Sequence, residues 1–452
     1  MVDHHTRRSV LTLAGASGMT LAGCLDSDGD DTDDTNDTND TDGTPEEDGP
    51  TDEPTNETET GEDETDPADM EVEGSPLEAS FEEVVAVSNL ELPWDIAFAP
   101  TGDVFFTERS GRIRHTTIEV LSGDSPTDES EIDTDQIDLP GVVTDSEGGT
   151  LGIAVHPEYP EPAYVYVFYT AMLEERVDRV ARYDATTQDD VEIIVDGLPG
   201  EGYHNGGRIR FGPDGLLWIT RGDTHEPDQA QNPDTPVGTL LRVSEDGEPR
   251  GSDEAPPDAD PRVVTHGHRN MQGLDWLPDG TPIATEHGPD ARDEVQLLSP
   301  GNNYGWPTAR GGPDDSEYGA YGETPEFAPP IASSGTEVTW APSGGSWYGD
   351  DALPYLRNRF LFGGLRSRQL HVLTLLDQET EPPDDATAVY GEDWYDDRYL
   401  AVRHELLVEE YGRIRHVAQG PEGAIYLLTS NRGGRAEPTE QDDIILRLDP
   451  ET

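Results

Sequence analysis

The chain has 452 residues, with 97 Asp and Glu against 28 Lys and Arg, and every one of those 28 is Arg. A formal charge of −69 excludes a general nucleic-acid-binding protein, because phosphates would be repelled. One Cys excludes an intrachain disulfide bond. The charge and the missing Lys predict adaptation to concentrated salt, which screens the self-repulsion of an acidic surface.

The N-terminus has the features of an export signal. Arg7-Arg8-Ser9-Val10-Leu11 is a twin-arginine pattern, and the apolar run behind it, up to Leu21, is too short to span a membrane. Leu21-Ala22-Gly23-Cys24 resembles a lipobox, in which Cys24 becomes the lipidated first residue of the mature protein. Residues 1–23 are therefore predicted to be a signal peptide, with export by the twin-arginine route and a lipid anchor on the outer face of the cell membrane.

Lipidation of Cys24 predicts a mature N-terminus that carries lipid on that residue. Stable retention needs two lipid chains, since one chain binds only marginally. Mass spectrometry of the purified N-terminal peptide checks this. An intact peptide that runs through unmodified Cys24 would contradict it.

Residues 24–78 have the composition of a disordered tether. They contain 24 acidic residues and no basic ones, separated by Thr, Gly, Pro and Asn. Such a segment cannot bury enough apolar surface to offset its ordering entropy. Asn36, Asn39 and Asn56 each begin an Asn-x-Thr sequon, which predicts glycosylation outside the cell.

Residues 79–452 show short alternating apolar runs and no long helical periodicity, which indicates an all-β fold. A Pro-x-Gly turn recurs before these runs at Pro100, Pro213, Pro278, Pro342 and Pro421, and His156-Pro157-Glu158-Tyr159 takes the corresponding place in the second repeat. Six repeats predict a six-bladed β-propeller of four-stranded blades. A pair of β-sandwiches would explain the strands but not the sixfold recurrence. We expect Phe81–Val87 to close the ring against Ile444–Leu448.

Polar residues gather in the loops of these repeats, and in a propeller such loops meet at one end of the central channel. The loops contain His204-Asn205-Gly206-Gly207-Arg208, Gly267-His268-Arg269-Asn270-Met271-Gln272-Gly273-Leu274, His287-Gly288-Pro289, and Asn303-Tyr304-Gly305-Trp306-Pro307. In this order the motifs resemble the soluble glucose and aldose sugar dehydrogenases that depend on pyrroloquinoline quinone (PQQ). The resemblance runs from Leu92 to Gly420 and implies oxidation of an aldose at C1 to the lactone.

The resemblance assigns the catalytic roles to three residues. His204 matches the base that removes the hydroxyl proton, and an imidazole titrates in the range that this role needs. Asp223 matches the carboxylate that orients this base and contacts the substrate. Arg269 matches the residue that stabilises the developing oxyanion as hydride arrives.

PQQ is a flat tricarboxylate, and the resemblance places a set of donors around it. Arginine binds carboxylates through two parallel hydrogen bonds and stays charged in a desolvated site. The cofactor-binding residues implied are Arg269, Asn270, Thr339, Arg366, Arg413 and Arg415. Arg366 stands where the family usually has Lys, so the charge is kept but the geometry differs.

A calcium ion is implied by the same resemblance. Backbone carbonyls of Gly288 and Pro289 would hold this hard cation together with cofactor oxygens, and Asp293 would support the site. Glu147, within Asp145-Ser146-Glu147-Gly148-Gly149, stands where a Gln usually contacts the substrate. Its carboxylate accepts hydrogen bonds from sugar hydroxyls but cannot donate one.

Two other functions remain open on the sequence: a calcium-dependent propeller that hydrolyses sugar lactones, and a lipid-anchored binding propeller without catalysis. The lactonase would not need arginines that converge on a planar anion, and in the binding propeller the loops would only contact a ligand. For the dehydrogenase we expect an aldose sugar as substrate and an external electron acceptor, with a small copper protein or a quinone as candidates. No nucleic-acid partner is expected, and the membrane is contacted only through the lipid anchor.

Overall fold

The computed structural model describes residues 65–188, 191–313 and 315–451. The predicted signal peptide, Cys24, the three sequons and residues 24–64 of the predicted tether lie outside the described residues. Among the residues that are described, no helix is both long enough and apolar enough to cross a membrane.

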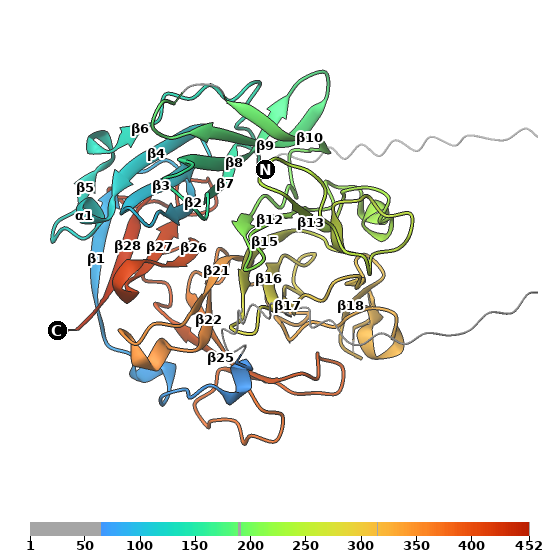
Figure 1. Ribbon diagram of the computed structural model, residues 1–452. Helices are drawn as coiled ribbons and strands as arrows, with labels where there is room; N and C mark the ends of the chain where they lie inside the picture. Colours follow the sequence, from blue (N-terminus) through green and yellow to red (C-terminus); the bar gives the residue numbers. More distant parts are fainter. Residues whose placement is uncertain (1–64, 189–190, 314, 452) are drawn as a thin grey trace, which may run out of the picture. The chain divides into compact units, whose positions relative to one another are not determined.

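Six β-sheets follow one another in chain order around a central axis (Figure 1), as predicted for a six-bladed propeller. The first three blades are β2 (Pro93–Phe98), β3 (Asp103–Glu108), β4 (Arg112–Thr117) and β6 (Asp133–Thr134); β7 (Thr150–Val155), β8 (Tyr164–Met172), β9 (Arg176–Asp184) and β10 (Glu192–Pro199); and β11 (Ile209–Phe211), β12 (Leu217–Thr220), β13 (Thr239–Val243) and β14 (Val263–His266).

The last three blades are β15 (Met271–Trp276), β16 (Pro282–Glu286), β17 (Glu294–Leu297) and β20 (Ala332–Ser333); β21 (Pro342–Tyr348), β22 (Arg359–Gly364), β23 (Leu370–Leu376), β25 (Leu400–Leu406) and β24 (Ala388–Tyr390); and β26 (Ile414–Gln419), β27 (Ile425–Thr429), β28 (Ile445–Pro450), β1 (Phe81–Ser88) and β5 (Thr127–Asp128). Outside the blades lie β18 (Ala309–Gly311) with β19 (Gly319–Ala320), α1 (Ile118–Leu121), and the short 3-10 helices η1 (Pro67–Asp69), η2 (Pro76–Glu78), η3 (Glu129–Glu131), η4 (Pro227–Gln231), η5 (Tyr321–Glu323), η6 (Pro354–Leu356) and η7 (Pro421–Gly423).

The ring closes where the N-terminal strand joins the last blade. β1 pairs with β28 in an antiparallel register that sets Val85 opposite Leu446 and Val87 opposite Ile445, as the sequence predicted. Antiparallel pairing of distant segments leaves neither of these strands as an open edge at the closure.

The core consists of apolar clusters between neighbouring blades rather than one central mass. Phe105 and Phe106 on β3 show why consecutive apolar residues occur within these strands: Phe105 packs toward the second blade and Phe106 toward the sixth, and both are fully buried. Successive side chains point to opposite faces of a sheet, and here both faces are covered.

The recurring Pro-x-Gly segments connect the first two strands of a blade in four cases, at Pro100, Pro213, Pro278 and Pro421. The fifth prediction is wrong in place, because Pro342-Ser343-Gly344 begins strand β21. A Cβ on Gly344 would lie 1.9 Å from His416 Nδ1. Glycine is therefore required here by close packing near the axis and not by a turn.

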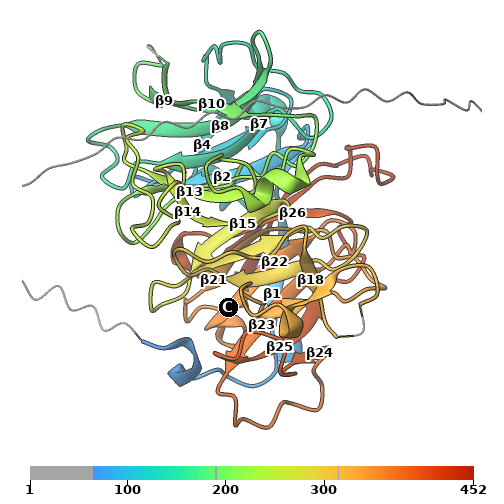
Figure 2. The ribbon, with the colours of Figure 1, turned by 90° about the vertical axis from the view of Figure 1, so that its right-hand side faces the viewer.

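The structure also differs from the predicted tether at its C-terminal end. Residues 65–78 include η1 and η2, which lie against β23 and β25 (Figure 2). The Arg359 guanidinium donates to the Gly74 carbonyl at 2.8 Å, and Asn358 Nδ2 donates to the Glu71 carbonyl at 2.9 Å. These bonds come from the fifth blade and offset the ordering entropy that the segment's own composition cannot.

Asp95 on β2 joins several blades near the axis. Its fully buried carboxylate lies 2.5 Å from Arg208 Nη1 and 2.7 Å from Arg210 Nη2, and it accepts a bond from the Ile153 N–H at 3.0 Å. Burial alone would raise the pKa of Asp95, but the two arginines hold it well below its usual range.

We expect Asp95→Asn to lower the free energy of unfolding by about 3–5 kcal/mol, because the buried guanidinium of Arg208 and the partly buried one of Arg210 lose their counter-ion. The surface pair of Asp196 and Arg179 is the matched control: its carboxylate is 54% exposed, and Asp196→Asn should cost at most about 1 kcal/mol. Denaturant unfolding in high salt measures both. Equal effects of the two changes would contradict the expected role of Asp95.

Candidate active site

The predicted site residues lie at one end of the channel. They occupy two kinds of segment: the residues just before or at the start of the innermost strands β7, β11, β15, β21 and β26, and the loops after the second strands β12, β16 and β22. The innermost strands contact one another around the axis, so the segments at one of their ends converge.

His204 and Asp223 form the centre of the site. The His204 Nδ1 atom lies 2.7 Å from Asp223 Oδ1, and Trp306 Nε1 donates to Asp223 Oδ2 at 2.8 Å. Asp223 is 2% exposed and His204 is 17% exposed, so the carboxylate is enclosed while the imidazole reaches the surface of the site. An ionised carboxylate accepts only, so Nδ1 carries the proton and Nε2 is left as the basic atom.

The backbone at His204 is held in the left-handed region, with φ of 58°. Its N–H donates to Glu147 Oε2 at 3.2 Å, and its carbonyl accepts a bond from Thr224 N. A Cβ on Gly222 would lie 1.9 Å from the His204 carbonyl oxygen, so only glycine permits this approach. The structure thus brings Glu147 directly against the segment that carries His204.

Arg269 and Asn270 lie next to this centre. The Asp223 N–H donates to the Arg269 carbonyl at 2.8 Å, and Asn270 Oδ1 accepts a bond from Gly206 N at 3.1 Å. Arg269 Nε and Asn270 Nδ2 are buried and have no hydrogen-bond partner among the described residues. Burial lowers the pKa of Arg269 from its ordinary value. Unpartnered buried donors of this kind are the donors that an anionic or carbonyl-bearing ligand would satisfy.

A group of arginines lines the same end of the channel. Burial, and then the charges of Arg109 and Arg413, lower the pKa of Arg415 far below its ordinary value. Burial together with Arg435, Arg368 and Arg366 lowers the pKa of Arg413 to about 10. Arg366 is exposed, and its backbone N–H donates to Trp340 O at 2.9 Å.

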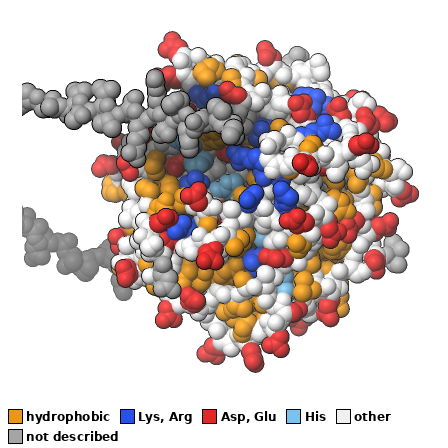
Figure 3. Space-filling view, turned by 180° about the vertical axis from the view of Figure 1, so that it is seen from behind, with side chains coloured by type: hydrophobic (Ala, Val, Ile, Leu, Met, Phe, Trp, Pro, Cys, Tyr) orange, Lys and Arg blue, Asp and Glu red, His pale blue; other side chains and the backbone are white. Residues whose placement is uncertain are grey.

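The distribution of charge on the surface is consistent with this group of arginines. On a chain with many more acidic than basic residues, basic side chains and histidines gather near the middle of one face (Figure 3). Like charges that are buried together repel one another, and a bound polyanion would relieve this repulsion.

Asp293 connects the predicted metal loop to Thr339. Its Oδ2 accepts bonds from Thr339 Oγ1 at 2.8 Å and from Trp340 N at 2.6 Å, and its Oδ1 accepts a bond from Gly288 N at 2.9 Å. A Cβ on Gly288 would lie 2.1 Å from the Ala291 carbonyl oxygen, so the loop is tight. Within the described residues, no group of three His, Cys, Asp or Glu side chains could hold a metal ion. A cation here would take backbone carbonyls.

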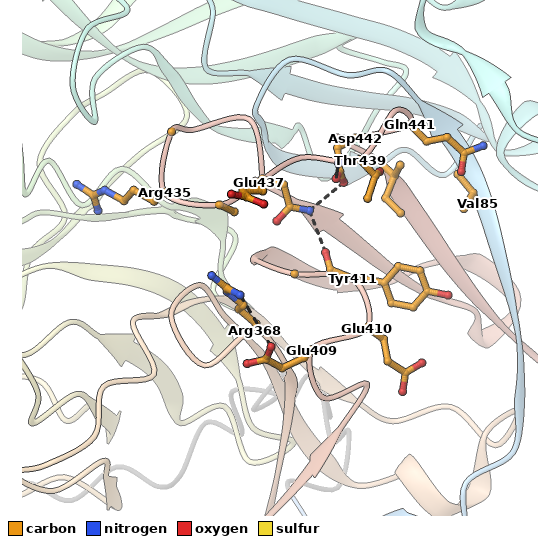
Figure 4. A pocket seen from close by; sticks show the side chains of 15 residues that line it. Val85, Arg368, Glu409, Glu410, Tyr411, Arg435, Glu437, Thr439, Gln441 and Asp442 are labelled. Carbon is orange, nitrogen blue, oxygen red and sulfur yellow. Dashed lines mark hydrogen bonds and ion pairs between the residues drawn. The ribbon is translucent and has the colours of Figure 1, made fainter.

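A groove of about 810 Å³ borders the site between the loops at residues 409–412 and 431–442. Arg368 and Arg435 lie at one end of it, and Val85 and Gln441 lie at the other (Figure 4). Arg435 Nη2 is 3.8 Å from Glu147 Oε1, so this end of the groove adjoins the His204 segment. Arg435 is 62% exposed and is accessible from solvent.

Sequence reasoning missed four residues that line or support the site. Trp94, Arg109 and Gln272 line a small cavity with Glu147 and Arg415, and Trp306 binds Asp223. Gln272 Oε1 accepts a hydrogen bond from Arg415 Nη1 at 2.6 Å. Gln272 lies within the motif at residues 267–274 and Trp306 within the motif at residues 303–307, whereas Arg109 follows β3 and its neighbours in the sequence form no motif.

The fold and the site together define a class of protein. It is a six-bladed propeller whose channel end combines a histidine–aspartate pair with several buried arginines. The model of the Glucose / Sorbosone dehydrogenase family matches residues 90–445, and the chain belongs to this family.

Three relatives illustrate the membership. Aldose sugar dehydrogenase YliI of Escherichia coli is 27% identical over 77% of this chain and 90% of its own length. Quinoprotein glucose dehydrogenase B of Acinetobacter calcoaceticus is 31% identical over 53% of this chain and 55% of its own length. The structure of the PQQ-bound aldose sugar dehydrogenase from Streptomyces coelicolor is 29% identical, covers 83% of this chain and 99% of that one, and superposes with a TM-score of 0.65.

Proposed function

We propose that this protein oxidises an aldose sugar at C1 to the lactone, with PQQ as the hydride acceptor and an external acceptor for the electrons. The single observation that carries the proposal is the convergence of buried arginines beside the His204–Asp223 pair. Family membership and a PQQ-bound relative support the same reading.

The residues present fit a planar tricarboxylate. Arg415 and Arg413 would pair with its carboxylates, with Arg366 at the exposed side. Arg269 and Asn270 offer the unpartnered buried donors that quinone carbonyls would accept. Thr339 would also border the cofactor, and its hydroxyl is held by a hydrogen bond to Asp293. When bound, PQQ supplies the acceptor for the hydride that leaves the sugar carbon.

His204 would remove the proton of the C1 hydroxyl through Nε2. Asp223 keeps the proton of His204 on Nδ1 and stabilises the imidazolium that forms, and Trp306 fixes the second oxygen of Asp223. Arg269 places a positive charge beside the oxygen that becomes negative. Glu147 would accept hydrogen bonds from sugar hydroxyls, with its charge balanced by Arg109 and Arg435.

A calcium ion at the Gly288 and Pro289 carbonyls is part of the proposal. Asp293 holds the Gly288 N–H and the Thr339 hydroxyl at once, which supports a loop shaped for a cation.

We expect sugar oxidation to need both PQQ and a divalent cation. Purified apoprotein in high salt should reduce no dye until both are added. Without PQQ the site has no hydride acceptor, and without the cation the Gly288–Pro289 loop lacks the ion that would help to hold the cofactor. An absorbance scan and a dye-reduction assay over a sugar panel measure this. Full activity after exhaustive chelation and cofactor removal would contradict it, and hydrolysis of sugar lactones without PQQ would favour a lactonase instead.

A further inference from the structure

A buried ion pair lies directly behind the site. Glu286, the last residue of β16, accepts bonds through Oε1 from Arg269 N and from Arg310 Nη2, both at 2.6 Å. Its Oε2 lies 2.9 Å from His268 Nδ1. Glu286 and Arg310 are both fully buried, and neither belongs to the predicted site.

Arg310, on β18, connects this carboxylate to other parts of the site. The His287 carbonyl accepts bonds from Arg269 Nη1 at 3.2 Å and from Arg310 Nη2 at 3.4 Å. The guanidinium carbons of Arg269 and Arg310 lie 5.5 and 5.8 Å from the centre of the Trp306 ring. Trp306 in turn holds Asp223.

We propose that Glu286 and Arg310 are a positioning pair, which holds Arg269 and Trp306 in the geometry required for sugar oxidation; this inference rests on the proposed function. One end of the pair fixes the backbone of Arg269. The other end supports the Trp306 ring and, through it, the orientation of Asp223 and His204. Neither Glu286 nor Arg310 would touch the substrate.

Stability alone is a weak reason for such a pair. Taking two charges out of water costs several kcal/mol, and well-packed apolar residues often serve the fold as well or better. The distinctive feature of Glu286 is its contact with the Arg269 N–H, whereas Glu294, the other carboxylate on Arg310, bonds to Gln296 and Tyr321 and not to the site. A misplacement of about 1 Å at a reacting group can cost about a hundredfold in rate.

The test compares Glu286→Gln with Glu294→Gln. Each change removes one buried carboxyl group from Arg310. Burial raises the pKa of Glu294 to about 7, so the comparison is made at a pH above that value, where both changes remove a charge and should lower the melting temperature. Glutamine keeps an oxygen that accepts from the Arg269 N–H but loses the charge that holds the Arg310 guanidinium. At saturating PQQ, we therefore expect Glu286→Gln to slow sugar-driven reduction of the cofactor by about ten- to hundredfold in single-turnover absorbance measurements. Glu294→Gln should stay within about threefold of the wild type, since its partners lie away from Arg269.

Equal rates for the two variants would overturn the positioning role, as would a wild-type rate for Glu286→Gln. If Glu286→Gln does not fold, Arg310→Lys replaces it: an ammonium keeps the charge but cannot reach Glu286, Glu294 and the His287 carbonyl together. A slow Arg310→Lys beside a normal Glu294→Gln supports the proposal, and a normal Arg310→Lys overturns it. A wild type that binds PQQ but is not reduced by any sugar would overturn the proposed function itself, and the positioning role with it.

Discussion

His204→Ala should lower kcat for aldose oxidation by at least about a hundredfold, because a positioned general base contributes about 10²–10⁴-fold. PQQ affinity should change little. The proposed cofactor contacts come from Arg366, Arg413, Arg415 and Asn270, and none of these side chains bonds to the imidazole of His204 in the structure.

The neighbouring His225 provides the matched control. Its ring lies 4.6 Å from that of His204, yet it is exposed and its imidazole bonds to no carboxylate among the described residues. His225→Ala should therefore keep most of the activity. A PQQ titration beside steady-state kinetics measures both variants. If His204→Ala keeps more than about a tenth of the rate, His204 is not the base.

Arg415→Met should weaken the binding of PQQ but raise the stability of the apoprotein. It removes one charge-assisted contact, worth about 1.5–3 kcal/mol, so the Kd for PQQ should rise about 10- to 150-fold. Excess PQQ should partly restore activity. High salt should soften the loss only slightly, because the group is buried.

The apoprotein should become more stable by the same change. Burial and the neighbouring cations Arg109 and Arg413 depress the pKa of Arg415 in the folded state. A cation whose folded pKa lies below its unfolded value destabilises the fold at all pH values below that folded pKa, so removing the charge at neutral pH relieves a cost.

Arg357→Met is the control for net charge. Arg357 is 45% exposed and pairs with Asp351, so its loss should leave both the PQQ affinity and the melting temperature nearly unchanged. Thermal unfolding of the apoprotein in high salt and a PQQ titration check the prediction. A lower melting temperature for Arg415→Met than for the wild type would indicate that Arg415 is structural.

Much of the fold was accessible to sequence reasoning because its signals are local. Alternating apolar runs and turns specify strands within a few residues, and their recurrence counts the blades. The exception is instructive: Pro342-Ser343-Gly344 looks like the other turns, yet the glycine there serves the approach of His416 and Arg208 near the axis. A three-residue pattern cannot distinguish a turn from a close packing contact.

The sequence by itself determined the all-β class, the sixfold repeat, the closure by Phe81–Val87 and the loops that carry His204, Asp223 and Arg269. Only the tertiary structure decided how these loops meet. Trp306 contacts Asp223 across 83 positions of sequence, and Arg310 reaches Glu286 across 24. Neither contact leaves a periodicity in the chain. The first depends on the curvature of the ring, which sets the third and fourth blades side by side, and the second depends on how the long connection between β17 and β20 folds back onto β16. The burial and mutual repulsion of Arg109, Arg413 and Arg415 follow from that same convergence.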